Sequence, residues 1–134
     1  MKRLAVLEIF LILLTVCCKK DMNSFNSGQP FELKYSEIKN YTDSGIFIYL
    51  DSVLNDSRCP KNGLCIWAGN AEVRFVYSKD NNSVKFVLNT LSAFRTDSLI
   101  NGYRIKLINL SPYPEIAGSI KQDDYKAEIK ITKE

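Results

Sequence analysis

The chain is organised around the stretch Asn55-Asp-Ser-Arg-Cys59-Pro-Lys-Asn-Gly-Leu-Cys65-Ile-Trp67-Ala-Gly-Asn-Ala71. This stretch contains two of the four cysteines and the only tryptophan of the 134 residues. On both sides of it, apolar and polar residues alternate with the period of two that is typical of β-strands. The sequence therefore predicts a loop between two strands, and this loop is the first candidate for a functional site.

Cys59 and Cys65 enclose Pro60 and Gly63, which favour a tight turn. A disulfide between them would close a short loop and stabilise the fold by about 2 kcal/mol. A zinc site is the first alternative, but zinc usually takes four Cys or His ligands and the chain has no histidine. A redox pair is the second, but its two cysteines are normally separated by two residues. We therefore expect a disulfide, which requires an oxidising compartment.

Two side chains of this stretch have both a structural and a ligand-binding interpretation. Trp67 is expected to be a core or partly buried ring over the disulfide, because Ile66 and Ala68 flank it; the alternative is an exposed platform that stacks on a sugar or a peptide. Arg58 follows Asp56 by two residues. Its guanidinium is expected to lock the loop through paired hydrogen bonds, and ligand binding is the alternative.

The N-terminus has the form of an export signal. The basic start Met1-Lys2-Arg3 precedes a mostly apolar run over residues 4–16, which is too short to span a bilayer. Cys17 and Cys18 follow directly, and this arrangement resembles a bacterial lipoprotein signal peptide. The resemblance implies removal of residues 1–17 and a lipid on Cys18, with Cys17 as the alternative site.

Such a lipid anchor sets the expected location. Two or more acyl chains hold a protein stably on a membrane. We therefore expect a protein of the bacterial cell envelope, anchored to the outer membrane on its periplasmic or surface face. An ordinary secreted protein is the alternative. Residues 18–29 are polar and lack periodicity, which predicts a flexible tether before a single domain over residues 30–134.

The composition gives no reason to expect nucleic acid as a partner. Charged residues make up 25% of the chain and the formal net charge is +3, with basic and acidic residues interspersed. Roughly one hundred residues follow the predicted tether, which suffices for one domain with a single core.

Alternating patterns recur through this predicted domain. Their apolar positions are Phe31, Leu33 and Tyr35; Ile46, Ile48 and Leu50; Ala71, Val73, Phe75 and Tyr77; Val84, Phe86 and Leu88; Tyr103, Ile105 and Leu107; and Tyr125, Ala127, Ile129 and Ile131. Asn101-Gly102 is a strong signal for a two-residue hairpin, whereas residues 90–100 fit either a short strand or a loop. The pattern predicts an all-β protein, an antiparallel β-sandwich of six or seven strands, with a small β-barrel as the alternative.

Several motifs resemble those of a family of small uncharacterised lipoproteins of the Bacteroidetes type. The main ones are Asp56-Ser-Arg-Cys-Pro60 and Cys65-Ile-Trp-Ala-Gly-Asn-Ala71. Leu110-x-Pro112-x-Pro114 and Asp124-Tyr125-x-Ala127 are similar as well. The resemblance covers most of the chain after the leader. It implies a fold and a lipid-anchored location, and it implies no activity and no catalytic residue.

Known catalytic patterns are missing from the sequence. Without histidine it cannot form a Ser-His-Asp or a Cys-His arrangement, and it has no Gly-rich phosphate loop. We therefore expect neither an enzyme nor a cofactor or metal. The aspartates that the turns contain leave a calcium site at a loop end as a minor alternative.

The sequence thus predicts a non-catalytic module that binds a protein, a peptide or a glycan. The candidate binding residues are Arg58, Lys61, Trp67 and Tyr113. The alternative is a secreted inhibitor of a protease or a lysozyme-like enzyme, which would present the disulfide-stiffened loop between Cys59 and Cys65. A stiff loop binds well because it loses little conformational entropy on binding.

The lipid anchor can be tested by one substitution. We expect Cys18→Ser to release the protein from membranes, because it removes the residue that carries the acyl chains. The measurement is fractionation of cells into soluble and membrane pools, with Cys17→Ser as the matched control that stays on the membrane. Continued sedimentation of the Cys18→Ser protein with membranes would refute lipidation at this residue.

Overall fold

The computed structural model describes residues 24–41 and 44–134, so the predicted leader and both candidate lipidation sites, Cys17 and Cys18, lie outside it. The described residues form nine strands and one short helix. These are β1 (Ser24–Phe25), β2 (Pro30–Lys34), β3 (Ile38–Tyr41), β4 (Ile46–Asp56), β5 (Ala71–Lys79), β6 (Asn82–Asn89), β7 (Asp97–Ile100), β8 (Tyr103–Ser111), the 3-10 helix η2 (Gln122–Asp124) and β9 (Lys126–Lys133).

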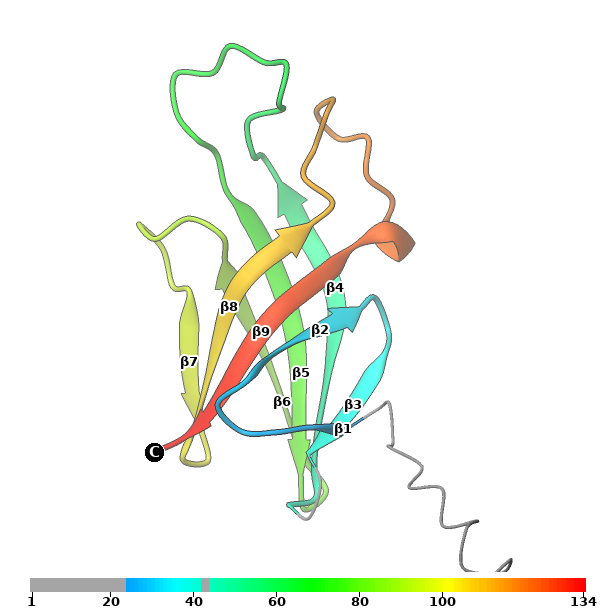
Figure 1. Cartoon of the computed structure of the whole chain (residues 1–134), viewed down its shortest axis with the longest axis vertical. Helices are drawn as coiled ribbons and strands as arrows, with labels where there is room; N and C mark the ends of the chain where they lie inside the picture. The colour runs from blue at the N-terminus through cyan, green and yellow to red at the C-terminus, as the bar shows by residue number, and fades with distance from the viewer. Residues whose placement is uncertain (1–23, 42–43) are drawn as a thin grey trace, which may run out of the picture.

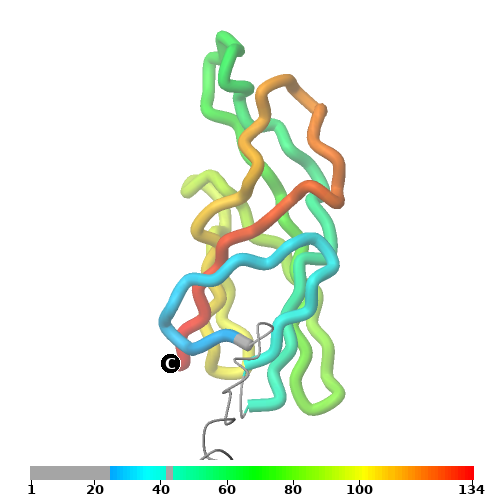
Figure 2. Tube along the Cα trace, turned by 45° about the vertical axis from the view of Figure 1, so that its right-hand side comes forward, coloured from blue at the N-terminus to red at the C-terminus, as the bar shows by residue number. Residues whose placement is uncertain are grey.

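The strands form two sheets that pack face to face. One sheet has the order β1-β3-β4-β5-β6 and the other has the order β2-β9-β8-β7. All pairings between these strands are antiparallel except the short parallel one between β1 and β3, and an isolated parallel bridge joins Tyr35 to Leu50. Figures 1 and 2 show the two layers, and the sheets do not close into a barrel. The predicted β-sandwich is confirmed, with more strands than expected because β1, β3 and β7 are too short to show an alternating pattern.

The core lies between the sheets and contains the alternating apolar residues. Ile46, Ile48 and Leu50 of β4, the central strand of its sheet, are fully buried. Tyr77 and Ile129 are fully buried too, in the neighbouring strand and in the opposite sheet. Burial of each such side chain contributes about 1.5 to 3 kcal/mol. The alternating pattern thus identified most of the inward positions, but Val84, which belongs to the predicted pattern, is 40% exposed, and Phe47, on the outer face of β4, is about half exposed.

The predicted hairpin at Asn101-Gly102 is present between β7 and β8. Both residues have positive φ angles, 50° and 76°. A two-residue turn of this kind needs positive φ at both positions, and its twist matches that of the paired strands. Residues 97–100, in the segment that the sequence left open, form strand β7.

The structure corrects the predicted tether. Phe25 is 3% exposed and its ring stacks on Phe31 and Tyr41, with centroid distances of 4.4 and 5.1 Å. The backbone N–H of Gly28 donates a hydrogen bond to the carbonyl of Ile131 at 2.7 Å. Residues 24–29 therefore belong to the domain. The sequence did not reveal this, because Phe25 is a single aromatic residue in a polar segment and a single residue gives no alternating pattern.

The two ends of the sandwich differ. The β4–β5 loop and the β8–β9 loop extend together from one end, at the top of Figure 1, whereas β1 lies toward the opposite end. We call residues 57–70 and 112–121 the loop end. Within the described residues, no helix has the length and apolar character needed to cross a membrane.

Candidate functional site

A disulfide closes the tip of the β4–β5 loop. Cys59 and Cys65 are bonded, with their Cα atoms 5.9 Å apart, as the sequence predicted. Inside the ring, the N–H of Gly63 donates to the carbonyl of Pro60 at 2.9 Å, which forms the tight turn expected from these two residues. The disulfide and the turn together restrict the loop tip to few conformations.

The base of the same loop continues the pairing of β4 and β5. The N–H of Cys59 donates to the carbonyl of Ala68 at 2.9 Å, and that of Ser57 donates to the carbonyl of Asn70 at 2.8 Å. Gly69 has a φ of +73°, and a Cβ at this position would lie 1.9 Å from the Ser57 carbonyl oxygen. Only glycine allows the two sides of the loop to approach this closely.

Asn70 joins this loop to the neighbouring β6–β7 loop. Its side chain is 6% exposed, its Nδ2 donates to Oδ1 of Asn89 at 2.8 Å, and its Oδ1 accepts the N–H of Leu91 at 3.1 Å. A buried amide is stable only when such bonds are formed. The sequence did not single out this residue, because an asparagine next to a glycine reads as an ordinary turn.

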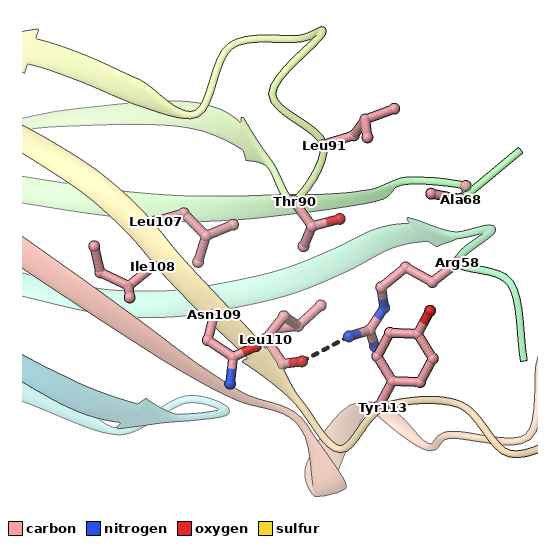
Figure 3. Close-up of a pocket in the computed structure, with 10 residues that line it drawn as sticks. Arg58, Ala68, Thr90, Leu91, Leu107, Ile108, Asn109, Leu110 and Tyr113 are labelled. Carbon is pink, nitrogen blue, oxygen red and sulfur yellow. Dashed lines mark hydrogen bonds between the residues drawn. The ribbon is translucent and has the colours of Figure 1, made fainter. Parts of the chain in front are cut away.

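Arg58 is the central residue of the loop end. It is 6% exposed, and its Nε and Nη2 donate to the two carboxylate oxygens of Asp56 at 2.8 and 2.7 Å. Nη1 donates to the carbonyl of Leu110 at 2.6 Å (Figure 3). Nη2 donates to the carbonyl of Pro112 at 2.9 Å. The expectation that Arg58 locks the loop is confirmed. The residue bonds both to the start of its own loop and to the start of the β8–β9 loop.

Two tyrosines complete this arrangement. The hydroxyl of Tyr125 donates to Oδ2 of Asp56 at 2.9 Å. The ring of Tyr113 lies over Arg58, with its centroid 5.1 Å from Cζ, which is the geometry of a cation–π contact. We call these four residues the Asp56–Arg58 cluster. They come from the last residue of β4, the β4–β5 loop, the β8–β9 loop and the residue before β9.

The pKa values in the cluster follow from these contacts. Burial alone raises the pKa of the Asp56 carboxyl, but the hydrogen bonds and charge of Arg58 and the hydroxyl of Tyr125 outweigh it and hold the pKa below its ordinary value. Burial and the hydrogen bond to Asp56 raise the pKa of Tyr125 to about 12. At neutral pH, Asp56 is therefore ionised and Tyr125 protonated, as their hydrogen bond requires.

The tip of the loop end presents apolar side chains to solvent. Leu64 and Ile66 are fully exposed, at 107% and 104%, Ile116 of the adjacent loop is 71% exposed, and Trp67 is 54% exposed. We call these four residues the apolar tip. Of the two predictions for Trp67, the core ring is wrong, because about half of the side chain is exposed; Trp67 precedes β5 and lies in the loop. Leu64 and Ile66 were missed, although apolar residues on both sides of Cys65 in a polar loop are a detectable signal.

The two loops of the apolar tip are tied to each other. The backbone N–H of Lys61 donates to the carbonyl of Pro114 at 3.1 Å. The Lys61 ammonium also lies 3.8 Å from Glu115, but both side chains are more than half exposed, so this pair contributes little. Of the predicted binding residues, the structure thus brings Lys61, Trp67 and Tyr113 to the loop end in exposed or partly exposed positions. Arg58 lies beneath them with its donors already engaged.

A pocket of about 240 Å³ lies beside the cluster, along β8 (Figure 3). Arg58 and Tyr113 form one end of it; most of the other side chains in its lining are apolar, but polar groups make up more of the pocket surface than apolar ones. In the part of the chain that the structure describes, no three His, Cys, Asp or Glu side chains form a group suited to a metal ion. The geometry of the loop end suits binding through shape and apolar contact.

The Asp56–Arg58 cluster can be tested by a substitution that keeps the charge. We expect Arg58→Lys to lower the free energy of unfolding by about 2 kcal/mol or more, because lysine cannot replace the fork and leaves buried carbonyl groups without donors. Urea unfolding of the purified protein measures this difference. Arg104→Lys is the matched control, since Arg104 forms salt bridges with Asp97 and Glu134 that are open to solvent, and this variant should lose clearly less stability than Arg58→Lys.

The same variants should differ in acid. Asp56 has a lowered pKa in the folded state, so its contribution to stability is complete above the unfolded value of about 4 and is lost as the pH falls through the folded value. Arg58→Lys weakens the hydrogen bonds to Asp56, so the free energy of unfolding of this variant should fall less with decreasing pH than that of the parent protein. Equal stability of Arg58→Lys and Arg104→Lys at neutral pH would contradict the role assigned to the cluster.

Comparison with known proteins gives no family for this chain. None of the protein-family models, curated proteins or solved structures matches it. What the protein does is therefore inferred from its sequence and from the geometry of the loop end.

Proposed function

We propose that this protein is a lipid-anchored module of the bacterial cell envelope that binds a partner protein through its apolar tip and catalyses no reaction. The observation that carries the proposal is the exposure of Leu64 and Ile66 on a loop that is held rigid from beneath. Single exposed apolar residues are common on protein surfaces, whereas Leu64 and Ile66 are both fully exposed on one disulfide-closed loop, and we take this pair as the mark of an interaction site.

The energetics favour a protein partner. A leucine or isoleucine that moves from water into an apolar pocket contributes about 1.5 to 3 kcal/mol. A flexible loop would lose much of this gain when binding orders it. Here the disulfide, the Asp56–Arg58 cluster and the bond between Lys61 and Pro114 order the loops beforehand. The apolar tip therefore keeps most of the free energy that its burial releases.

The position of the proposed anchor adds a second argument. Five residues separate Cys18 from Ser24, and they bridge at most about 20 Å when fully extended. The nine-residue strand β5 alone is about 30 Å long, and β1 lies toward the end of the sandwich opposite the loops (Figure 1). A lipid on Cys18 would hold the β1 end near the membrane and direct the apolar tip away from it, toward other proteins of the envelope.

Inhibition of an enzyme is the second candidate function. Leu64 is fully exposed next to Cys65 in a loop that the disulfide closes, which is a shape that can enter the active-site cleft of a protease or a lysozyme-like enzyme. This function would use the same surface, so the nature of the captured partner distinguishes the two.

The test uses crosslinking from a defined position in intact cells. A photocrosslinking amino acid, p-benzoylphenylalanine, in place of Leu64 should give a discrete crosslinked product, which mass spectrometry then identifies. The same amino acid in place of Ile38 is the control, because Ile38 is 54% exposed but lies on β3, outside the loop end. With the identified partner purified, Ile66→Asp should weaken binding about tenfold or more, since it places a charge in an apolar interface.

The outcomes separate the alternatives. A partner that is a hydrolase and loses activity on binding supports the inhibitor, and a partner without such activity supports the interaction module. Equal crosslinking from positions 64 and 38, or an unchanged dissociation constant for Ile66→Asp, would contradict the proposal that the apolar tip is the binding surface.

A further inference from the structure

Strand β8 is paired unequally on its two sides. Toward β9 the pairing runs from Tyr103 to Ser111, the whole length of the strand. On the other side, β7 pairs only with residues 103–106, and the last bond there runs from the N–H of Leu107 to the carbonyl of Thr96, at 2.9 Å. Among the described strands, none pairs with residues 108–111 on this side. The upper half of β8 is therefore an open sheet edge.

This open edge borders the pocket rather than bulk solvent alone. Residues 107–110 line one side of the 240 Å³ pocket, and Ala68, Thr90 and Leu91 line the other (Figure 3). Open edges are usually shortened, charged or covered, because they pair readily with other strands. Here the side chains at the edge are Ile108, which is 45% exposed, and the uncharged Asn109. Neither opposes the approach of another strand by charge.

The backbone of this edge offers hydrogen-bonding groups. A residue in an extended strand directs its N–H and its C=O to the same side. The carbonyl of Leu110 faces this side but already accepts a hydrogen bond from Arg58 Nη1 at 2.6 Å, so the N–H of Leu110, which faces the same side, is the group that it leaves for a partner strand. The register with β9 shifts between Leu107 and Asn109, which leaves Ile108 out of the ladder. This bulge changes the direction of the edge beside the pocket.

We propose that this edge binds an extended segment of a partner protein as an added strand of the β2-β9-β8-β7 sheet, with an apolar side chain of the segment in the pocket. The inference rests on the proposed function, since it assumes that the partner is a protein. Strands pair at about 4.8 Å, and alternate side chains of the added strand face the pocket. Main-chain hydrogen bonds then supply affinity, and the pocket supplies specificity.

The charge of the pocket narrows the class of peptide. Arg58 is the only ionisable side chain with a formal charge in its lining, and Asp56 already neutralises it at 2.7 Å. An acidic or basic ligand would find no free counter-charge there. We therefore expect an uncharged segment of about four residues in which medium-sized apolar residues alternate with polar ones, bound with little dependence on salt.

The test uses a phage-displayed library of random linear heptapeptides, panned on the purified protein. We expect selected peptides to alternate apolar and polar residues. In a synthetic copy of the best binder, N-methylation should weaken binding about tenfold at every second amide, the ones that face β8, and should have little effect at the amides between them. Ile108→Asp should weaken the same peptide about tenfold.

Leu99→Asp is the matched control, because Leu99 is 53% exposed and lies on β7, below the open edge. It should leave the affinity unchanged, and thermal melts of both variants should match the parent protein. Selection of no peptide, or of a peptide that tolerates both Ile108→Asp and N-methylation, would overturn the inference. If such a peptide is sensitive to Ile66→Asp, or if crosslinking from position 64 still captures a partner, the proposed function stands while strand addition fails.

Discussion

The structure depends on one buried ion pair, the fork that Arg58 forms with Asp56, and on the two carbonyl groups that the same guanidinium binds. Together with the backbone bond between Lys61 and Pro114, these contacts hold the β4–β5 loop and the β8–β9 loop side by side. A buried ion pair adds little net stability compared with an apolar replacement, but losing one partner of it costs about 3 to 5 kcal/mol. Here the ion pair fixes the position of the two loops relative to each other. The exposed surface that these loops form is therefore ordered as well.

That surface combines two features that a soluble domain normally avoids. Leu64 and Ile66 are exposed on a stiffened loop, and the upper half of β8 is an open edge beside a pocket. Arg58 lines the pocket and also fixes the loop that carries Leu64 and Ile66, so the two features share one support. A partner could contact both at once, with its surface on the tip and an extended segment on β8. The proposed lipid, at the opposite end, would leave this side free.

Much of the fold could be predicted from the sequence, because a sandwich core requires the inward residues of each strand to be apolar. The disulfide and the locking role of Arg58 were also predictable, since each is set by residues close together in the chain. The burial of Phe25 and the exposure of Trp67 were not, because each depends on whether a strand from elsewhere in the chain covers the ring. The open edge of β8 is likewise invisible in sequence, since it results from the length of β7 and not from β8 itself.

The central claim is that the loop end is ordered before any partner binds. Backbone ¹⁵N relaxation of the free protein tests it most directly, because the order parameter S² reports motion on the picosecond to nanosecond scale residue by residue. Ordered loops should give values of about 0.85 for residues 59–68 and 113–116, equal to those of the strands. Values below about 0.6 in these two segments would show a flexible tip, and would contradict the account.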